Sequence, residues 1–518
     1  MANANLFQTF KRTLLPAADA HNFEAAPAYR LTPKHRLAQY AATGCLNDTF
    51  YATAENQLDT VLALCQEVDA RFIAQTAVYC RERGYMKDMP ALLAAVLAAR
   101  GAEELAPVFG RVIDNGRMLR NFVQILRSGV TGRKSLGTRP KKLVQQWLNG
   151  ASETALLAAA VGNTPSLADV VKMVHPKPAQ AWREAYFAWL IGKPHAQEAL
   201  PAQVRAFEAW KRERGGELPD VPFQMLTALA LSPQDWAQCA LRGGWQMLRM
   251  NLNTFQRQGV FKLPGMVDAV AARLRDPQAI RTARVFPYQL MAACQAAGAG
   301  LPDPLRNALH DALELSLANV PQVEGKVVVC PDVSGSMSSP VSGYRGSATT
   351  QVRCIDVAAL VAAALLRRNP ETTVLPFERE VVEVHLDAGA PVFANARKLA
   401  SVGGGGTNCS APLARLNRMR ARADLVVFVS DNESWIDAAR GAGATATVAE
   451  WQRFKQRNPQ AKLVCIDIAP YGTTQAREAP DVLNVGGFSD AVFDIVAAFA
   501  AGQLRSDHWV GEIEAVTI

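Results

Sequence analysis

The segment KVVVCPDVSGS, residues 326–336, joins a short apolar run rich in β-branched residues to a loop that holds one aspartate and two serines. Runs with the same character follow it along the chain, at residues 372–377, 381–386, 424–429 and 462–468. Apolar β-branched runs of this length are typical of strands. Helical patterns separate several of the runs, at residues 356–368, 392–401 and 491–502. Strands that alternate with helices predict an α/β fold, with a mostly parallel sheet covered by helices on both faces.

The chain before residue 319 has a different pattern. From Leu37 to Ala318 it is rich in alanine and leucine, with apolar residues at three- and four-residue spacing, which indicates amphipathic helices. Short loops with glycine and proline separate the helical segments, and no convincing alternating strand lies between them. Serial helices of this kind are most simply stacked as an α-solenoid that resembles HEAT repeats. The link at residues 319–325 therefore divides a helical domain, residues 1–320, from an α/β domain, residues 325–518.

The length and composition fit a large globular protein. The 518 residues are 49% hydrophobic and 20% charged, which excludes a wholly disordered or collagen-like chain. The longest apolar runs, residues 91–99 and 358–366, are about half of the ~20 residues that cross a bilayer. Lys11 and Arg12 follow the first apolar residues, which is the wrong order for a secretory signal. We expect a cytoplasmic protein without a membrane span, and its nine scattered cysteines fit a reducing compartment.

The two domains carry different charge. Residues 1–320 hold 36 Lys and Arg against 26 Asp and Glu, and residues 321–518 hold 19 against 21, so the net charge of +8 divides into +10 and −2. Residues 111–150 alone hold nine basic residues and one acid, Asp114. A basic run is often only a solvated helix face. Here acidic partners at helical spacing are almost absent, so the positive charge favours binding of an external polyanion.

Hydroxyl and carboxylate side chains follow the predicted strands of the α/β domain. They are Asp332, Ser334 and Ser336 after the first strand, Thr407 in the segment GGGGTNCSAP, and Asp431 after the run DLVVFVS. Because loops at the carboxyl ends of strands in an open α/β sheet meet in one crevice, we expect these five side chains to come together. Their hard oxygens suit Mg²⁺ or another divalent cation, which binds about six oxygens. Glu433 is the only nearby candidate for a general base, so the pattern favours cation binding over catalysis.

The order of these motifs resembles the von Willebrand factor A domain and its metal-ion-dependent adhesion site. The matching features are DxSxS after a strand, a threonine preceded by glycine, and an aspartate at the end of a later strand. The resemblance implies that Ser334, Ser336 and Thr407 coordinate the cation through their hydroxyls. It also implies that Asp332 and Asp431 coordinate it directly or through water. The alternative is that Asp332 and Ser334 are only turn and helix-capping residues.

Nearly the whole chain resembles the Ro/SS-A sixty-kilodalton ribonucleoprotein family, in its bacterial form, whose helical part is called the TROVE domain. The matching segments are PDVSGSM, GGTNCSAP, SDNES and GGFSDAVFDIV in the α/β domain, and WQMLRMNLNTF, ARVFPYQLMAA and VVKMVHPKP in the helical domain. The resemblance implies a ring of helical repeats whose ends are bridged by the A domain. It implies that a Y-like noncoding RNA binds the basic outer surface. It also implies that single-stranded 3′ ends of misfolded RNAs enter a central hole that excludes a duplex.

The resemblance assigns candidate RNA-binding residues to two places. For the outer surface they are Arg133, Lys134, Arg139, Lys141, Lys142, Lys172, His175 and Lys177. For the hole they are Arg249, Asn251, Asn253 and Arg284. Two simpler interpretations stay open. His175, which precedes a proline, could be only a helix-end residue, and the residues assigned to the hole could serve helix capping or interhelical hydrogen bonds.

These features lead to one main hypothesis and two alternatives. The main hypothesis is a non-enzymatic RNA-binding protein, monomeric as a protein, that acts in small-RNA quality control. By resemblance it would pass structured RNAs to an exoribonuclease such as polynucleotide phosphorylase. The first alternative is a metal-dependent protein–protein adaptor whose helical domain binds protein. The second is a phosphohydrolase centred on Asp332, Asp431 and Mg²⁺, which the lack of a base and nucleophile pair disfavours.

Overall fold

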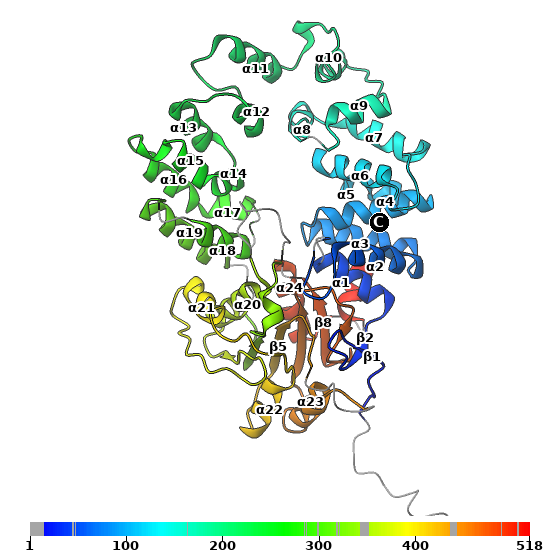
Figure 1. Ribbon diagram of the computed structural model, residues 1–518, viewed down its shortest axis with the longest axis vertical. Coiled ribbons are helices and arrows are strands. Elements are labelled where there is room, and N and C mark those ends of the chain that lie inside the picture. Colours follow the sequence, from blue (N-terminus) through cyan, green and yellow to red (C-terminus); the bar gives the residue numbers. More distant parts are fainter. Residues whose placement is uncertain are drawn as a thin grey trace, which may run out of the picture.

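The chain folds into a curved path of helices and an α/β domain built on one sheet, as Figure 1 shows. This computed structural model describes residues 15–43, 46, 48–162, 164–283, 285, 287–297, 300–317, 320, 322–341, 352–435, 443–487, 489–504 and 507–518. The helices of the curved path come first in the sequence, and the strands of the sheet come after residue 326. The fold class predicted from the sequence is therefore confirmed.

The helical part runs from α1 to α19. Its elements are α1 (Pro33–Thr43), α2 (Ala54–Glu67), α3 (Ala70–Glu82), α4 (Asp88–Arg100), α5 (Leu105–Val112), α6 (Gly116–Ser128), α7 (Thr138–Gly150), α8 (Glu153–Ala159), α9 (Leu167–Val174), α10 (Ala181–Leu190), α11 (Ala202–Glu213), α12 (Phe223–Thr227), α13 (Pro233–Arg242), α14 (Trp245–Met250), α15 (Leu252–Arg257), α16 (Met266–Leu274), α17 (Pro277–Ala283), α18 (Pro287–Ala296) and α19 (Asp303–Ser316). Serine side chains accept backbone N–H groups at the starts of α8, α9 and α13, which stabilises those helix ends. No helix in the described part of the chain is both long and apolar enough to span a membrane.

Helices that are neighbours in the sequence are mostly neighbours in space. On one side α3 packs against α4 and α5, and α4 packs against α6, while on the other α16 and α18 pack against α19. One close crossing requires glycine, because a Cβ on Gly116 of α6 would lie 2.1 Å from the Cβ of Ala159 in α8. Contacts between successive helices are what a solenoid requires. The finer likeness to HEAT repeats stays a prediction.

The α/β domain holds a five-stranded parallel sheet in the order β4-β3-β5-β6-β8. Its strands are β3 (Val327–Pro331), β4 (Thr373–Val374), β5 (Leu425–Ser430), β6 (Lys462–Asp467) and β8 (Val482–Gly486), and its helices are α20 (Cys354–Arg368), α21 (Val392–Leu399), α22 (Ala411–Arg418), α23 (Ala446–Arg457), α24 (Asp490–Ala500) and α25 (His508–Glu514). Successive residues of β5 enter two different cores. Val427 belongs to a buried cluster with residues of α20 and α24, and Phe428 belongs to one with residues of α22 and α23. Helices thus cover both faces of the sheet, as predicted.

The strands differ from the sequence prediction in three places. Residues 381–386, predicted as a strand, form only an isolated bridge between Val381 and Phe377. The sequence pattern does not predict β8, because the buried Asn484 interrupts its apolar run. It also misses β1 (Ala20–His21) and β2 (Pro27–Arg30), which pair with each other, and β2 pairs with β7 (Thr473–Thr474). This N-terminal hairpin, residues 20–30, therefore pairs with the α/β domain, although the predicted bounds 1–320 place it in the helical one.

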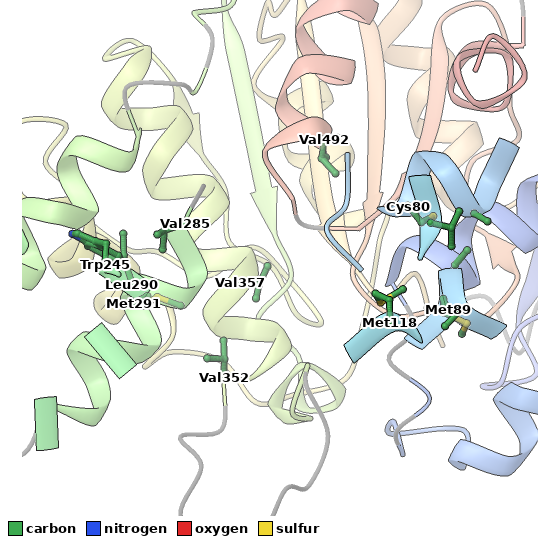
Figure 2. Close-up of a cluster of buried hydrophobic side chains, with 14 of the residues drawn as sticks. Cys80, Met89, Met118, Trp245, Val285, Leu290, Met291, Val352, Val357 and Val492 are labelled. Atoms are coloured by element: carbon green, nitrogen blue, oxygen red, sulfur yellow. The ribbon is translucent and has the colours of Figure 1, made fainter. Parts of the chain in front are cut away.

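Both ends of the helical path contact the α/β domain. At one end α1 packs against β8 and α3 against α25, and at the other α18 packs against α20 and α19 against α21. A single buried apolar cluster runs through this region, and Figure 2 shows side chains of both parts in it, among them Cys80, Trp245, Val357 and Val492. A cavity of about 250 Å³ lies between the two ends of the helical path and the α/β domain. Its lining includes Arg83 after α3, Arg281 of α17 and Asp494 of α24. The α/β domain thus joins the two ends of the helical path into a ring.

The cysteines are buried, as their apolar sequence surroundings predict. All eight cysteines in the described part of the chain are free and buried, and Cys45 lies outside the described residues. Burial raises the pKa of these thiols, for example that of Cys239 to about 11. Such thiols stay protonated at neutral pH and pack as small apolar side chains.

Candidate functional site

The register of the sheet brings the ends of β3 and β5 together. Pro331, the last residue of β3, pairs with Val429 of β5. The backbone N–H of Asp332 donates to the carbonyl of Val429 at 2.9 Å. Asp332 and Asp431 therefore follow two adjacent strand ends, as the sequence predicts for an open α/β sheet.

The glycine-rich segment at residues 403–406 carries Thr407 to the same place. The backbone N–H of Gly335 donates to the carbonyl of Gly405 at 2.9 Å, and that of Gly404 donates to the carbonyl of Val333 at 2.8 Å. Gly403 has a φ of 87°, and a Cβ there would lie 2.2 Å from the carbonyl oxygen of Val333. Only glycine fits this close approach. Thr407 is buried at the end of the segment.

Four of the predicted cation ligands are linked by hydrogen bonds, and the segment of the fifth, Thr407, packs beside them. The five are termed here the hydroxyl–carboxylate cluster: Asp332, Ser334, Ser336, Thr407 and Asp431. None of them is more than 7% exposed. Asp332 accepts hydrogen bonds from the backbone N–H of Ser334 at 2.8 Å and from the hydroxyl of Ser430 at 2.6 Å. The hydroxyls of Ser334 and Ser336 lie 3.3 Å apart, and Ser336 hydrogen-bonds to Asp431. Segments that are distant in the sequence thus supply a compact set of oxygens.

The carboxylates of the cluster lie in an environment that disfavours their charge. Burial raises the pKa of both aspartates, and the charge of Asp431 raises that of Asp332 further. A cation beside them would reverse this effect. In the described residues no group of three or more His, Cys, Asp or Glu is placed to hold a metal ion, so a cation here would depend on the hydroxyls. This donor set fits Mg²⁺, which binds through one or two carboxylates and keeps several waters.

A third carboxylate, that of Glu433, lies beside the cluster. Glu433 is fully buried, and its backbone N–H donates to Oδ1 of Asp431 at 3.3 Å. Burial, and then the charge of Asp431, raises the pKa of Glu433 to about 8. Its Oε2 accepts the backbone N–H of Phe23 at 2.7 Å, across 410 sequence positions. The sequence places Glu433 near the cluster, but no local pattern indicates its contact with the N-terminal hairpin.

The outer basic candidates gather around α7 and α9. Lys134, Arg139, Lys142, Lys172, His175 and Lys177 are exposed, and Arg133 and Lys141 are partly exposed. The lysines and arginines of this set form no ion pair with a carboxylate of the described residues. Gln145 of α7 donates to the carbonyl of Val174 at 2.6 Å, which fastens the end of α9 to α7. Because Lys141 lies one helical turn before Gln145, it lies on the same side of α7 as α9.

Three members of this basic set also have structural roles. Arg133 donates to the carbonyl of Ala98 at 3.1 Å, and Arg139 donates to that of Glu103 at 3.0 Å. His175 ends α9 as its C-cap, with a φ of 50°. The interpretation of His175 as a helix-end residue is thus structurally correct. Its role in RNA binding stays a prediction, because a capping residue can remain exposed to a ligand.

The candidates for the hole hydrogen-bond both within α14 and to another helix. Arg249 donates to the carbonyl of Gln289 at 2.9 Å, and Asn253 donates to that of Ala296 at 3.0 Å. Asn251 donates to the carbonyl of Met247 in its own helix at 2.8 Å. Arg249 and Asn253 also line a cavity of about 400 Å³ between α14–α15 and α18–α19. Arg249 and Asn253 therefore form interhelical hydrogen bonds, and their role in RNA binding stays a prediction. Arg284 lies outside the described residues.

Comparisons with known proteins agree with the motifs. Residues 326–500 match the family model described as the Ro60 vWA domain. The chain is 24% identical over 510 residues to the RNA-binding protein RO60 of Deinococcus radiodurans, which covers 92% of this chain and 94% of that protein. It is 23% identical over 251 residues to the RNA-binding protein RO60 of Caenorhabditis elegans, covering 46% of this chain and 37% of that protein. The crystal structure of the Deinococcus radiodurans RO (RSR) protein matches with a TM-score of 0.63 at 23% identity, over 91% of this chain and 100% of that one.

Proposed function

We propose that this chain is a non-enzymatic RNA-binding protein of the cytoplasm. Its residues 326–500 match the Ro60 vWA domain model, and nearly its whole length is similar to a Ro protein. Its ligands are a Y-like noncoding RNA on the outer surface and the single-stranded 3′ ends of misfolded RNAs inside the ring. It acts as a monomer in small-RNA quality control, together with an exoribonuclease such as polynucleotide phosphorylase. The resemblance that the motifs indicate is confirmed by the matches, and the RNAs and the partner are our proposal.

The observation that carries the proposal is the basic surface on α7 and α9. Its lysines and arginines lack carboxylate partners in the described part of the chain, so their charge is available to phosphates. In Figure 1, α7 and α9 lie on the outer side of the ring, and α8 lies between them and its centre. A structured RNA can therefore contact this surface without entering the ring. Phosphate contacts of this kind supply affinity without demanding a particular sequence.

A binding path inside the ring explains how the protein selects RNAs with an unpaired end. A single strand can pass where a duplex cannot, and arginine and amide side chains can hold its phosphates and bases with little sequence preference. Asn253 is exposed at the cavity between α14–α15 and α18–α19. One of its amide hydrogens reaches Ala296, which leaves the amide oxygen as an acceptor for a base.

The hydroxyl–carboxylate cluster would hold Mg²⁺ or a similar divalent cation. The aspartates would supply charge, and the hydroxyls would supply neutral oxygens. The bound ion would supply positive charge for an acidic group of a partner. Glu433 is a neighbouring carboxylate that could serve as a base, and the N–H of Phe23 already binds one of its oxygens. The site therefore supports binding and not hydrolysis.

The dependence of RNA affinity on salt tests the proposal. If about five phosphates of a single strand are neutralised, log K falls with a slope near −3.5 against log salt. Raising the salt from about 50 to about 200 mM should then weaken binding ~10²-fold. Filter binding with a short single-stranded RNA measures the slope. An affinity for RNA that does not change with salt would contradict a phosphate-binding surface.

A metal-dependent protein adaptor is the second candidate, and exposed aromatic rings near the cluster favour it. Phe23 and Phe50 are 54% and 57% exposed. Both pack on Tyr51, which contacts Tyr471. Tyr471 lines a small pocket together with Ser336 and Asp431. Exposed aromatic side chains of this kind are common at protein interfaces. An adaptor without an RNA function would show no RNA titration in the salt experiment.

A further inference from the structure

The N-terminal hairpin is fastened to the segment that follows Asp431. The side-chain amide of Asn22 donates to the carbonyl of Ser434 at 2.7 Å. The backbone N–H of Phe23 donates to Oε2 of Glu433 at 2.7 Å. Asn22 also holds the turn of the hairpin, because its side-chain oxygen accepts the backbone N–H groups of Glu24 and Ala26. These contacts join segments more than 400 positions apart.

The second oxygen of Glu433 has no hydrogen-bond partner in the part of the chain that the structure describes. Glu433 is 0% exposed, and its Oε1 makes no hydrogen bond within the described residues. A buried carboxylate oxygen without a donor is costly, so it usually marks the place of a water or an ion. The hydroxyl–carboxylate cluster lies close to Glu433, because the backbone N–H of Glu433 donates to Oδ1 of Asp431 at 3.3 Å and the charge of Asp431 acts on the Glu433 carboxylate.

The donor that fits this oxygen is a water held by a cation in the cluster. Direct coordination by Glu433 together with both aspartates is disfavoured, because no three acidic side chains of the described chain converge as metal ligands. Mg²⁺ keeps several of its waters when it binds to proteins. A water on a cation is a strong hydrogen-bond donor, and carboxylates next to a metal site commonly accept from such groups.

We propose that Glu433 is a further residue of the cation site and that it links the bound ion to the N-terminal hairpin. Its Oε1 accepts from a water on the ion, and its Oε2 accepts from the N–H of Phe23. Cation binding then fixes residues 20–30, which pair with β7 through β2 and lead into α1. This inference rests on the proposed cation binding and not on the proposed RNA binding.

Calorimetry and hydrogen exchange test the link in the full-length protein. The wild-type protein should bind Mg²⁺, and Mg²⁺ should slow the exchange of the Phe23 amide about tenfold. Glu433→Gln keeps an acceptor for Phe23 but removes the charge that orients the metal-bound water. It should weaken Mg²⁺ binding about tenfold or more, as expected for residues that support metal ligands. In this variant, Mg²⁺ should no longer slow the amide hydrogen exchange of residues 20–30, even at a concentration that saturates the wild-type protein.

Two further variants make the outcome specific. Asp431→Asn should abolish Mg²⁺ binding and the protection together. Glu478→Gln alters a partly buried glutamate of the same domain, one that accepts from Asn484, and it should leave both readouts unchanged. If Glu433→Gln binds Mg²⁺ within about twofold of the wild type, the link is overturned while the cation site stands. If the wild-type protein binds no divalent cation, the cation site and the link both fail.

Discussion

Exchanging Lys141 and Lys142 for glutamate is expected to weaken the binding of a structured RNA about 10- to 100-fold at low salt. The two lysines lie at the start of α7, next to the loop after α9 that carries His175 and Lys177. If these lysines bind phosphates as proposed, each reversal removes a contact and adds a repelling charge, so the salt dependence of binding should also become shallower. Gel-shift titration of a hairpin RNA at two salt concentrations measures both effects.

A matched control variant distinguishes an effect of where the charge lies from an effect of the net charge of the protein. Arg418 and Arg422 are exposed at the end of α22 and just after it, and α22 lies at the opposite end of the molecule from α7 in Figure 1. Reversing both of them changes the net charge equally but should leave hairpin binding nearly intact. The double variant at Lys141 and Lys142 should bind a short single-stranded RNA tail as tightly as the wild-type protein does. Equal losses in the two double variants would show that only net charge matters and would remove the proposed outer site.

Replacing Trp509 by alanine is expected to lower the free energy of unfolding by about 3–5 kcal/mol, the usual cost of deleting a buried aromatic side chain. Trp509 is 1% exposed in α25. Its Nε1 donates to the hydroxyl of Tyr79 at 3.1 Å, and its ring meets the edge of His35 with centroids 5.6 Å apart. The side chain therefore attaches α25 to α1 and α3, where the helical path begins. Denaturant unfolding measures the loss, and hydrogen exchange should show it first in α25.

The variant Trp509→Phe is the control for this prediction. It keeps most of the packing but loses the hydrogen bond to Tyr79 and part of the ring volume, so the expected cost is about 1–2 kcal/mol, smaller than that of the alanine variant. A loss below about 1 kcal/mol in Trp509→Ala would mean that α25 does not stabilise the junction between the two parts. RNA affinity of the alanine variant at low temperature would show whether an intact ring is needed for binding.

The sequence predicts the centre of the sheet better than its edges. The strands β3, β5 and β6 are continuous apolar runs because they are buried on both faces. The run at residues 381–386 has the same composition but finds no strand to pair with beyond one bridge. In β8, Asn484 is buried because its side chain bonds to Ala476 and Glu478. Such tertiary partners are not visible in a local pattern.

The candidate sites show the same limit. Most of the hydroxyl–carboxylate cluster is predictable because Asp332 and Asp431 follow strand ends, and the strand order of a parallel sheet brings those ends together. The contact between Phe23 and Glu433 joins opposite ends of the chain, and nothing near either residue signals it. For Arg249 and Asn253 the sequence indicates the residues but not their contacts. Their polar side chains are conspicuous in a helical segment, but their hydrogen bonds to α18 only become known from the folded structure.

On the proposed function, this ring binds RNA and distinguishes an unpaired end from a closed duplex. A gel-shift comparison of one hairpin RNA with and without a single-stranded 3′ overhang tests it most directly, using the purified full-length protein at low salt. We expect both RNAs to bind through the outer surface, and the overhang to raise the affinity about tenfold or more through added single-strand contacts. Equal affinity for the two hairpins would contradict threading of a strand into the ring, and no binding of either would contradict the proposed function itself.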